Sequence, residues 1–287
     1  MKKPGPQPFY TMNNVSWAPS LYFTVTVYWR CVPPPEASWY PVLKTELAEK
    51  DGIVLRGHDH PAEQESRFFI EASPEHAPSF ILQRVKGRLQ HLVRSMHPKA
   101  FQRNYFLRSV GRTKQDKVEG YLRKQLAHHP MADERVVEMF EAYQFEDADL
   151  CLSSIRASSH GRFQYNLHFV LVNDQRWREI REEPICRYRD GVIGIARKKS
   201  HLLKAVGLLP DHCHVSLGAD VGESPGEVVL GYMNNLAYVM GMKAIFQARV
   251  WVGTAGDYDI GAVKLAERAA PGAESWPHRD KPGGGRV

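Results

Sequence analysis

The sequence repeats one pattern in its two halves: an aromatic-rich, strand-like segment that ends at a glycine and precedes a helix-like segment. The first copy runs from Asn104 to Gly111 and the second from Arg249 to Gly256. Before each copy lies an amphipathic stretch, from about Ser79 and from Gly226, whose apolar residues recur at the three- and four-residue spacing of a helix on a sheet. The repeat predicts an internal duplication, which restricts the chain to two similar units.

The expected elements follow the same order in both halves: strand, helix, strand, strand, helix, strand. This order is the split βαβ pattern. We therefore predict an α+β protein of two ferredoxin-like domains related by a pseudo-twofold axis, with antiparallel sheets and helices on one face. The expected divisions are an N-terminal domain at 1–128, a connector at 129–160, a C-terminal domain at 161–270 and a disordered tail rich in Pro and Gly at 271–287.

Two short motifs carry chemistry, and each occurs in one half only. In the second half His212 and His214 flank Cys213 on an expected strand, so both imidazoles leave one face and can present two nitrogens to a divalent metal. In the first half Tyr121 and Gln125 lie one helical turn apart and face the same way. A phenol, with an ordinary pKa of about 10, attacks phosphate only with help from a metal and positive groups, and a glutamine oxygen can complete the metal's ligands.

Each half lacks the motif that the other half carries. Aligning the two amphipathic helices places Glu65 and Arg67 opposite the histidine pair. Aligning the two glycines places Ala266 and Ala270 opposite the tyrosine and the glutamine. Because the losses are complementary, we expect one active site built across the two halves and a second site that is dead.

A second His-x-His pattern, His58 and His60, has the polar Asp59 where a buried strand needs an apolar residue. In a chain with 13 histidines, a chance match to so short a pattern is expected. We interpret this segment as a surface turn ahead of a strand, and its role as a ligand site stays open.

The positive net charge indicates which kind of partner the protein binds. The net charge of +6 and the pI of about 9.1 suit a polyanion. Basic residues interleaved with aromatic ones between positions 86 and 124 are typical of single-strand binding, although a solvated basic helix face gives the same pattern. The residues expected to contact DNA are Lys86, Arg88, Arg108, Arg112, Arg123 and Lys124.

Cysteine usage and hydropathy indicate a compartment. The four cysteines are widely spaced, without a CxxC pair, which fits a reducing cytosol. No apolar run approaches the roughly 18 residues of a membrane span, and the N-terminal residues do not read as a signal peptide. We expect a cytoplasmic protein with no membrane partner.

Four segments together resemble one known family. Leu209–Val215, which reads LPDHCHV, resembles the Met-Pro-Asn/Asp-His-hydrophobic-His stretch of single-tyrosine HUH transposases. Gln83–Arg88, Asn104–Gly111 and Gly120–Gln125 look like the rest of the same domain. The family includes small insertion-sequence transposases and relatives associated with repetitive extragenic palindromes. The resemblance covers most of both halves and leaves out the connector and the tail.

The resemblance implies cleavage of single-stranded DNA, with hairpin-containing DNA as the expected partner. Tyr121 would attack the scissile phosphate, form a 5′-phosphotyrosine and free a 3′-OH, with Mg²⁺ or Mn²⁺ held by His212, His214 and Gln125. Insertion-sequence members are dimers whose tyrosine helix can serve the partner's histidine pair. The chain would thus be a pseudo-dimer that acts as a monomer or a homodimer.

Two other functions stay open at this point. One is a domesticated, catalytically silent protein that binds DNA or RNA hairpins and needs no metal. The other is a two-domain protein in which the His-x-His pair only packs in the core.

Overall fold

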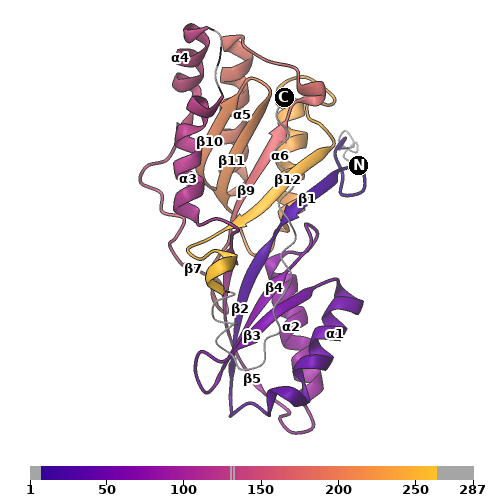
Figure 1. The fold of residues 1–287 in the computed structure, drawn as a ribbon. Helices are drawn as coiled ribbons and strands as arrows, with labels where there is room; N and C mark the ends of the chain where they lie inside the picture. The colour runs from indigo at the N-terminus through magenta and orange to yellow at the C-terminus, as the bar shows by residue number, and fades with distance from the viewer. Residues whose placement is uncertain (1–7, 130, 132, 264–287) are drawn as a thin grey trace, which may run out of the picture.

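A computed structural model describes residues 8–129, 131 and 133–263. Two six-stranded sheets lie one above the other in Figure 1, the lower built mainly by the N-terminal half and the upper mainly by the C-terminal half. One hydrophobic core cluster contains buried side chains of both halves, and the rings of Phe23 and Tyr165 meet in it with their centroids 5.9 Å apart. The halves are therefore packed into one body.

The N-terminal half folds as a split βαβ unit. Its strands pair antiparallel in the order β3-β4-β2-β5. Phe23 and Val25 of β2 are buried together with Leu47 and Val85 of the two helices, because alternate residues of a strand face the helices. The elements are β2 (Tyr22–Trp29), α1 (Tyr40–Asp51), β3 (Val54–Asp59), β4 (Glu65–Glu71), α2 (Pro78–Val93) and β5 (Phe101–Val110).

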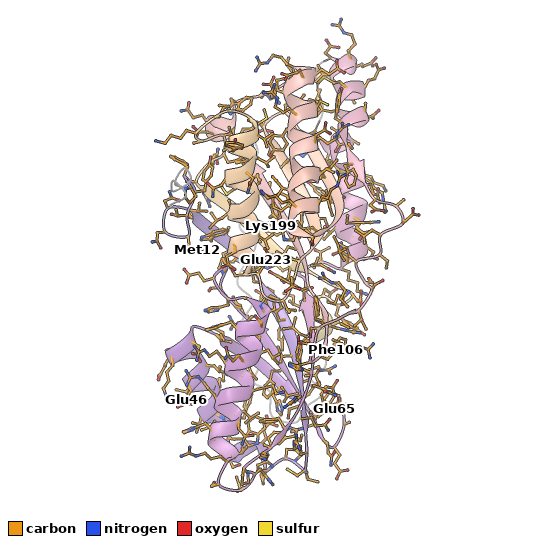
Figure 2. All side chains as sticks on the ribbon, turned by 180° about the vertical axis from the view of Figure 1, so that it is seen from behind. Met12, Glu46, Glu65, Phe106, Lys199 and Glu223 are labelled. Atoms are coloured by element: carbon orange, nitrogen blue, oxygen red, sulfur yellow. The ribbon has the colours of Figure 1, made fainter. Side chains whose placement is uncertain are left out.

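The C-terminal half repeats this arrangement, with strand order β12-β9-β11-β10. Ser224 and Glu227 form a capping box at the start of α6. Seen from behind, the helices α1, α2, α5 and α6 stand in front of the two sheets (Figure 2). The elements are β9 (Asn166–Val172), α5 (Glu182–Lys199), β10 (Leu202–Leu209), β11 (His212–Gly218), α6 (Pro225–Val239) and β12 (Arg249–Ala255). Two ferredoxin-like units are thus confirmed, and the pseudo-twofold relation between them stays a prediction.

Short segments cross between the halves in a reciprocal way that the sequence did not indicate. Strand β1 (Ser16–Ser20) leads into β2 but pairs parallel with β12 of the other half. Strand β8 (Arg162–Gln164) leads into β9 but pairs parallel with β5. Strands β6 (Phe145–Glu146) and β7 (Arg156–Ala157), from the segment expected to be a connector, extend one sheet each. Each sheet is therefore completed by residues of both halves.

Two hydroxyl groups join the ends of β5 and β12. The Ser109 hydroxyl donates to the Ala255 carbonyl at 2.6 Å, and the Thr254 hydroxyl donates to the Val110 carbonyl at 2.6 Å. Each hydroxyl also accepts a bond from the N–H of the residue that opens β9 or β2, at 3.1 and 2.9 Å. These two residues have the same position in the repeated segments, so the two copies contact each other through the part of the pattern that they share.

The repeated glycine lies at the same junction. A Cβ atom on Gly256 would lie 2.1 Å from the carbonyl oxygen of Ser109, which is closer than any side chain can come. The carbonyl of Gly256 accepts a hydrogen bond of 2.9 Å from the N–H of Gln115, the first residue of α3 (Gln115–Lys124). The glycine thus permits the close approach of the two strands and fixes the start of α3.

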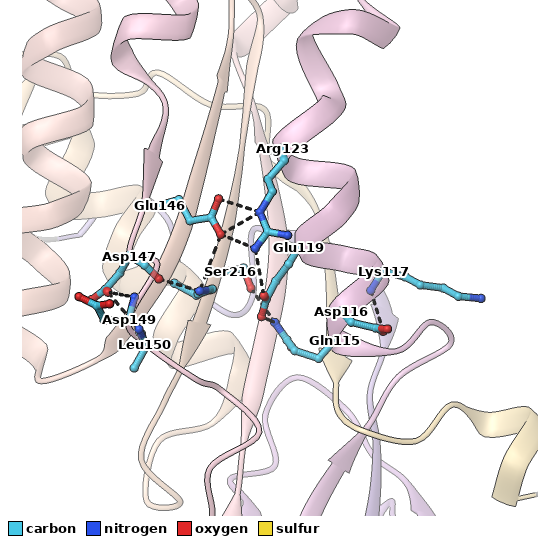
Figure 3. Close-up of polar contacts among 11 residues, drawn as sticks. Gln115, Asp116, Lys117, Glu119, Arg123, Glu146, Asp147, Asp149, Leu150 and Ser216 are labelled. Atoms are coloured by element: carbon cyan, nitrogen blue, oxygen red, sulfur yellow. Dashed lines mark hydrogen bonds and ion pairs between the residues drawn. The ribbon is translucent and has the colours of Figure 1, made fainter.

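Helix α3 belongs to the N-terminal half by sequence but packs on the upper sheet. Val118 and Leu122 form a small buried cluster with Ala205 of β10 and Ala255 of β12. The Gln115 side chain donates to the Ser216 hydroxyl at 3.3 Å (Figure 3). The upper sheet therefore carries α5 and α6 on one face and α3 on the other.

The remaining elements connect these units. They are the 3-10 turns η1 (Glu36–Ser38), η2 (Gln125–His128) and η3 (Asp174–Arg176), together with α4 (Glu134–Tyr143) in the segment expected to be a connector. No helix within the described residues is long and apolar enough to cross a membrane. The positions Ala266 and Ala270 and the tail from 271 lie outside the described residues.

Candidate active site

The face of the upper sheet that α3 covers is lined by polar residues. Along β11, Cys213 is buried on the side of α5 and α6, whereas His212, His214 and Ser216 lie on the opposite side. His168 on β9 is paired with Ser216 and shares that side. Alternation along two neighbouring strands thus gathers three imidazoles beneath the helix contributed by the N-terminal half.

His212 and His214 lie side by side, with ring centroids 5.2 Å apart. The Nδ1 atom of His212 is 2.7 Å from a carboxylate oxygen of Asp211. The Nδ1 atom of His214 is 3.1 Å from Nε2 of His168. Since Nδ1 of each ring is engaged, Nε2 is the atom left to bind a metal, as is usual for metal-binding histidines held by a second group.

Tyr121 lies against this pair. Its ring centroid is 5.5 Å from that of His214, and 40% of the residue is exposed. The rings of His128 and His129, in and just after η2, flank the site: His128 stacks on Tyr121 at 6.3 Å and His129 meets His212 at 5.3 Å. The phenol of one half and the imidazole pair of the other thus face the same space.

Gln125 is fully buried at the start of η2, directly over Gly207 of β10, which pairs with His214. A Cβ atom on Gly207 would lie 1.9 Å from the amide nitrogen of Gln125, so only glycine leaves room for this side chain. The amide nitrogen donates to Gln144 at 2.9 Å. Among the described residues, the amide oxygen is buried without a hydrogen-bond partner.

Burial keeps the imidazoles of His168 and His214 neutral. Desolvation lowers the pKa of His214 to about 2 and the pKa of His168 to about 4, and the neighbouring imidazoles lower that of His214 further. A neutral imidazole is the form that binds a metal. Burial also raises the pKa of the Cys213 thiol to about 12, so this cysteine serves the core.

These shifts predict that the protein loses stability in acid. The unfolded chain takes up protons on its histidines below pH about 6.5, whereas folded His168 stays neutral down to pH about 4. The free energy of unfolding should therefore fall as the pH drops below about 6.5, by at most about 1.4 kcal/mol per pH unit for this group. Urea titrations at pH 7 and pH 5 with chelator present measure the slope. A His168→Gln variant should show a shallower slope, and an unchanged slope contradicts the assignment.

Three of the six basic residues predicted to contact DNA are paired within the protein. Lys86 donates to three backbone carbonyls at 102–104, the shortest contact being 2.8 Å. Arg88 pairs with two carboxylates of α1, one of which, on Glu46, is labelled in the lower half of Figure 2. Arg123 holds the carboxylate of Glu146, its Nε atom 2.9 Å from both oxygens (Figure 3). These side chains therefore stabilise the packing of α2 and α3 against neighbouring segments, in addition to contributing positive charge.

The other three basic residues are less constrained by protein groups. Arg108 lies over the ring of Phe106 at 4.5 Å and near that of Tyr258 at 5.7 Å. Arg112, three residues before α3, and Lys124, the last residue of α3, are exposed. The contact of all six residues with DNA stays a prediction.

The lower sheet has no histidine pair at the corresponding position. Strand β4 begins at Glu65 as β11 begins at His212, and both strands are seven residues long. Arg67, which takes the place of the second histidine, pairs with Asp59. A glutamate at the first position and an arginine paired with an aspartate at the second do not offer two neutral nitrogens to a metal.

The interpretation of residues 58–60 as a surface turn is wrong. Strand β3 continues through Asp59, and the side chain of His58 is 0% exposed. Among the described residues, Glu36, His58 and His60 place one ligand atom each within 4.8 Å of one another, a group that could hold a metal ion. The polar Asp59 does not exclude a buried strand here, because Asp59 lies on the open face of the sheet beside Arg67. His58 instead faces the helices.

The fold also brings to the site His128, His129 and His168, which the sequence motifs did not indicate. A signal existed for His168, since the first four residues of β9 alternate polar and apolar like those of β11. Nothing local marked the other two, which reach the site through the turn after α3.

Comparisons with known proteins found weak, partial matches among solved structures. No described protein family matches the sequence, and no curated protein matches it. Among solved structures, a REP-associated tyrosine transposase bound to a REP hairpin matches with 16% identity and a TM-score of 0.29. The match covers 36% of this chain and 61% of the other, so this chain spans less than two thirds of that protein's length.

Proposed function

We propose that the protein is a metal-dependent single-strand DNA endonuclease and strand transferase of the HUH type, with one composite site. The observation that supports this most is the contact between halves: Tyr121, on a helix of the first, lies 5.5 Å from the His214 ring of the second. A nucleophile and two imidazoles facing one space suit transfer of a phosphodiester to the phenol. The expected internal duplication and its domain boundaries are part of this proposal.

In the proposed reaction the Tyr121 oxygen loses its proton to a base and attacks phosphorus. A new bond joins this oxygen to phosphorus while the bond to the 3′-oxygen breaks, so the 5′-phosphate remains on the enzyme and the 3′-oxygen gains a proton. His212, His214 and the unpartnered amide oxygen of Gln125 are the residues that would hold Mg²⁺ or Mn²⁺. That ion would supply positive charge to the phosphate.

One tyrosine holds one DNA end at a time. Nicking and rejoining, or processing of a single end, therefore fits a single chain, whereas concerted cutting of two ends needs two chains or successive turnovers. Exposed Arg112 and Lys124 beside α3 would meet the phosphates of a hairpin-containing strand.

The test uses the full chain, a 3′-labelled hairpin-bearing single strand and Mn²⁺. We expect a covalent adduct that survives denaturant, is abolished by chelator, and is absent from a His212→Ala, His214→Ala variant that still binds the hairpin. Hairpin binding without any adduct would contradict the proposed enzymatic activity and would favour a catalytically silent binding protein. Absence of affinity for nucleic acid at low salt would overturn both.

A further inference from the structure

A second group of metal-binding side chains lies in the N-terminal half. Glu36 belongs to the turn η1 before α1, His58 to the edge strand β3, and His60 to the loop between β3 and β4. One ligand atom from each lies within 4.8 Å of the others. None of the three takes part in the site proposed above, which lies on the other sheet.

His58 is buried without a hydrogen-bond partner. Its side chain is 0% exposed and packs between the rings of Trp39 and Phe68, whose centroids are 5.0 and 4.8 Å away. The Nδ1 atom lies 3.1 Å from an oxygen of Glu36, but neither ring nitrogen makes a well-directed hydrogen bond. Buried polar atoms are nearly always satisfied, and a ligand shared with the Glu36 carboxylate would satisfy the ring nitrogen that now contacts it without a well-directed hydrogen bond.

His60 is held in the orientation of a metal ligand. Its Nδ1 atom is 2.9 Å from the backbone carbonyl of Glu65, a contact that requires the proton on Nδ1. The lone pair then resides on Nε2, which lies 4.0 Å from the second oxygen of Glu36. A carbonyl that fixes the far nitrogen is the usual support of a metal-binding histidine.

We propose that Glu36, His58 and His60 bind a divalent transition metal of the zinc class. Two imidazoles and one carboxylate are ligands that zinc accepts, with a fourth position left for water. Ligand atoms around tetrahedral zinc lie about 3.4 Å apart, and the contacts of 3.1 and 4.0 Å bracket that value. The nitrogen-rich set distinguishes this site from one that selects Mg²⁺. The ion would tie the turn before α1 to the β3–β4 hairpin at the edge of the lower sheet.

The test uses a His212→Ala, His214→Ala chain, so that its result does not depend on the proposed nuclease site. Titration with Co²⁺ should give one bound ion per chain with the visible absorption of a four-coordinate site, and Zn²⁺ should displace it. Adding Glu36→Gln or His60→Ala should weaken binding by more than the roughly 100-fold that loss of a supporting hydrogen bond costs. Both side chains are partly exposed, so neither change empties the core.

The matched control is His91→Ala, an exposed histidine on α2, which should bind Co²⁺ like its parent. As a second measurement, chelator should lower the melting temperature of the parent and of the control but not that of the Glu36→Gln chain. Absence of bound Co²⁺ in the parent, or equal binding and equal chelator response in the parent and the Glu36→Gln chain, overturns the proposal.

Discussion

A Tyr121→Phe chain is expected to form no covalent adduct with single-stranded DNA. The change removes only the phenol oxygen, so the ring still packs against His214 and the hairpin should bind with the affinity of the wild type. Loss of a nucleophile costs an enzyme about 10⁶-fold in rate, which here means cleavage below detection. The measurement is the yield of denaturant-resistant adduct with Mn²⁺ present, set beside hairpin binding.

Tyr238→Phe provides the matched control. Tyr238 is 79% exposed on α6, on the other face of the same sheet, and its loss should leave the adduct yield unchanged. An adduct that persists in Tyr121→Phe, or one that disappears equally in both variants, would show that the composite site does not act as proposed.

The second large effect is expected from Gly256→Ala. The added Cβ would lie 2.1 Å from the Ser109 carbonyl oxygen, and because that atom belongs to the backbone of β5, the two strands must move apart. Overpacking of this kind costs about 1–3 kcal/mol, occasionally more. Since the Gly256 carbonyl also accepts from the first residue of α3, the same shift should move Tyr121 and lower the adduct yield.

Gly231→Ala is the control that distinguishes the destabilisation expected at Gly256 from any general effect of replacing glycine by alanine. No atom lies within 4 Å of the position where its Cβ would stand, and the residue is inside α6. The change should stabilise the chain by about 0.5–1 kcal/mol because alanine favours helices over glycine. Urea unfolding of both variants gives the comparison, and a Gly256→Ala chain as stable as Gly231→Ala would contradict the role given to the junction.

The sequence alone determined the main elements of each half and their order. The pattern of residues 203–209 predicts a strand, which is β10 (Leu202–Leu209), and that of residues 185–199 predicts a helix, which is α5 (Glu182–Lys199). Such patterns are local, since a strand repeats every two residues and a helix every 3.6. The same rule placed His212 and His214 on one face, and the equal order of elements in the two halves gave the two ferredoxin-like units.

Local pattern failed where the chain is irregular. The pairing of β3 with β4 shifts between Leu55 and Gly57, which breaks the alternation just before His58 and turns that side chain toward the helices. If the two-residue period of a strand is continued through the shift, His58 is assigned to the wrong face of the sheet. The buried group with Glu36 was therefore hidden, because its members come from a turn, a strand and a loop.

Only the tertiary structure decided how the halves meet. Strands β1 and β8 pair with the opposite half, and α3 leaves its own half to pack on Ala205 and Ala255, which brings Tyr121 beside His214. No periodicity in the sequence encodes such contacts, because they join residues far apart in the chain and depend on which exposed strand edge and which apolar face remain uncovered after each half has folded. The local sequence therefore determines the chemistry of each motif, whereas tertiary packing brings the tyrosine and the histidine pair together.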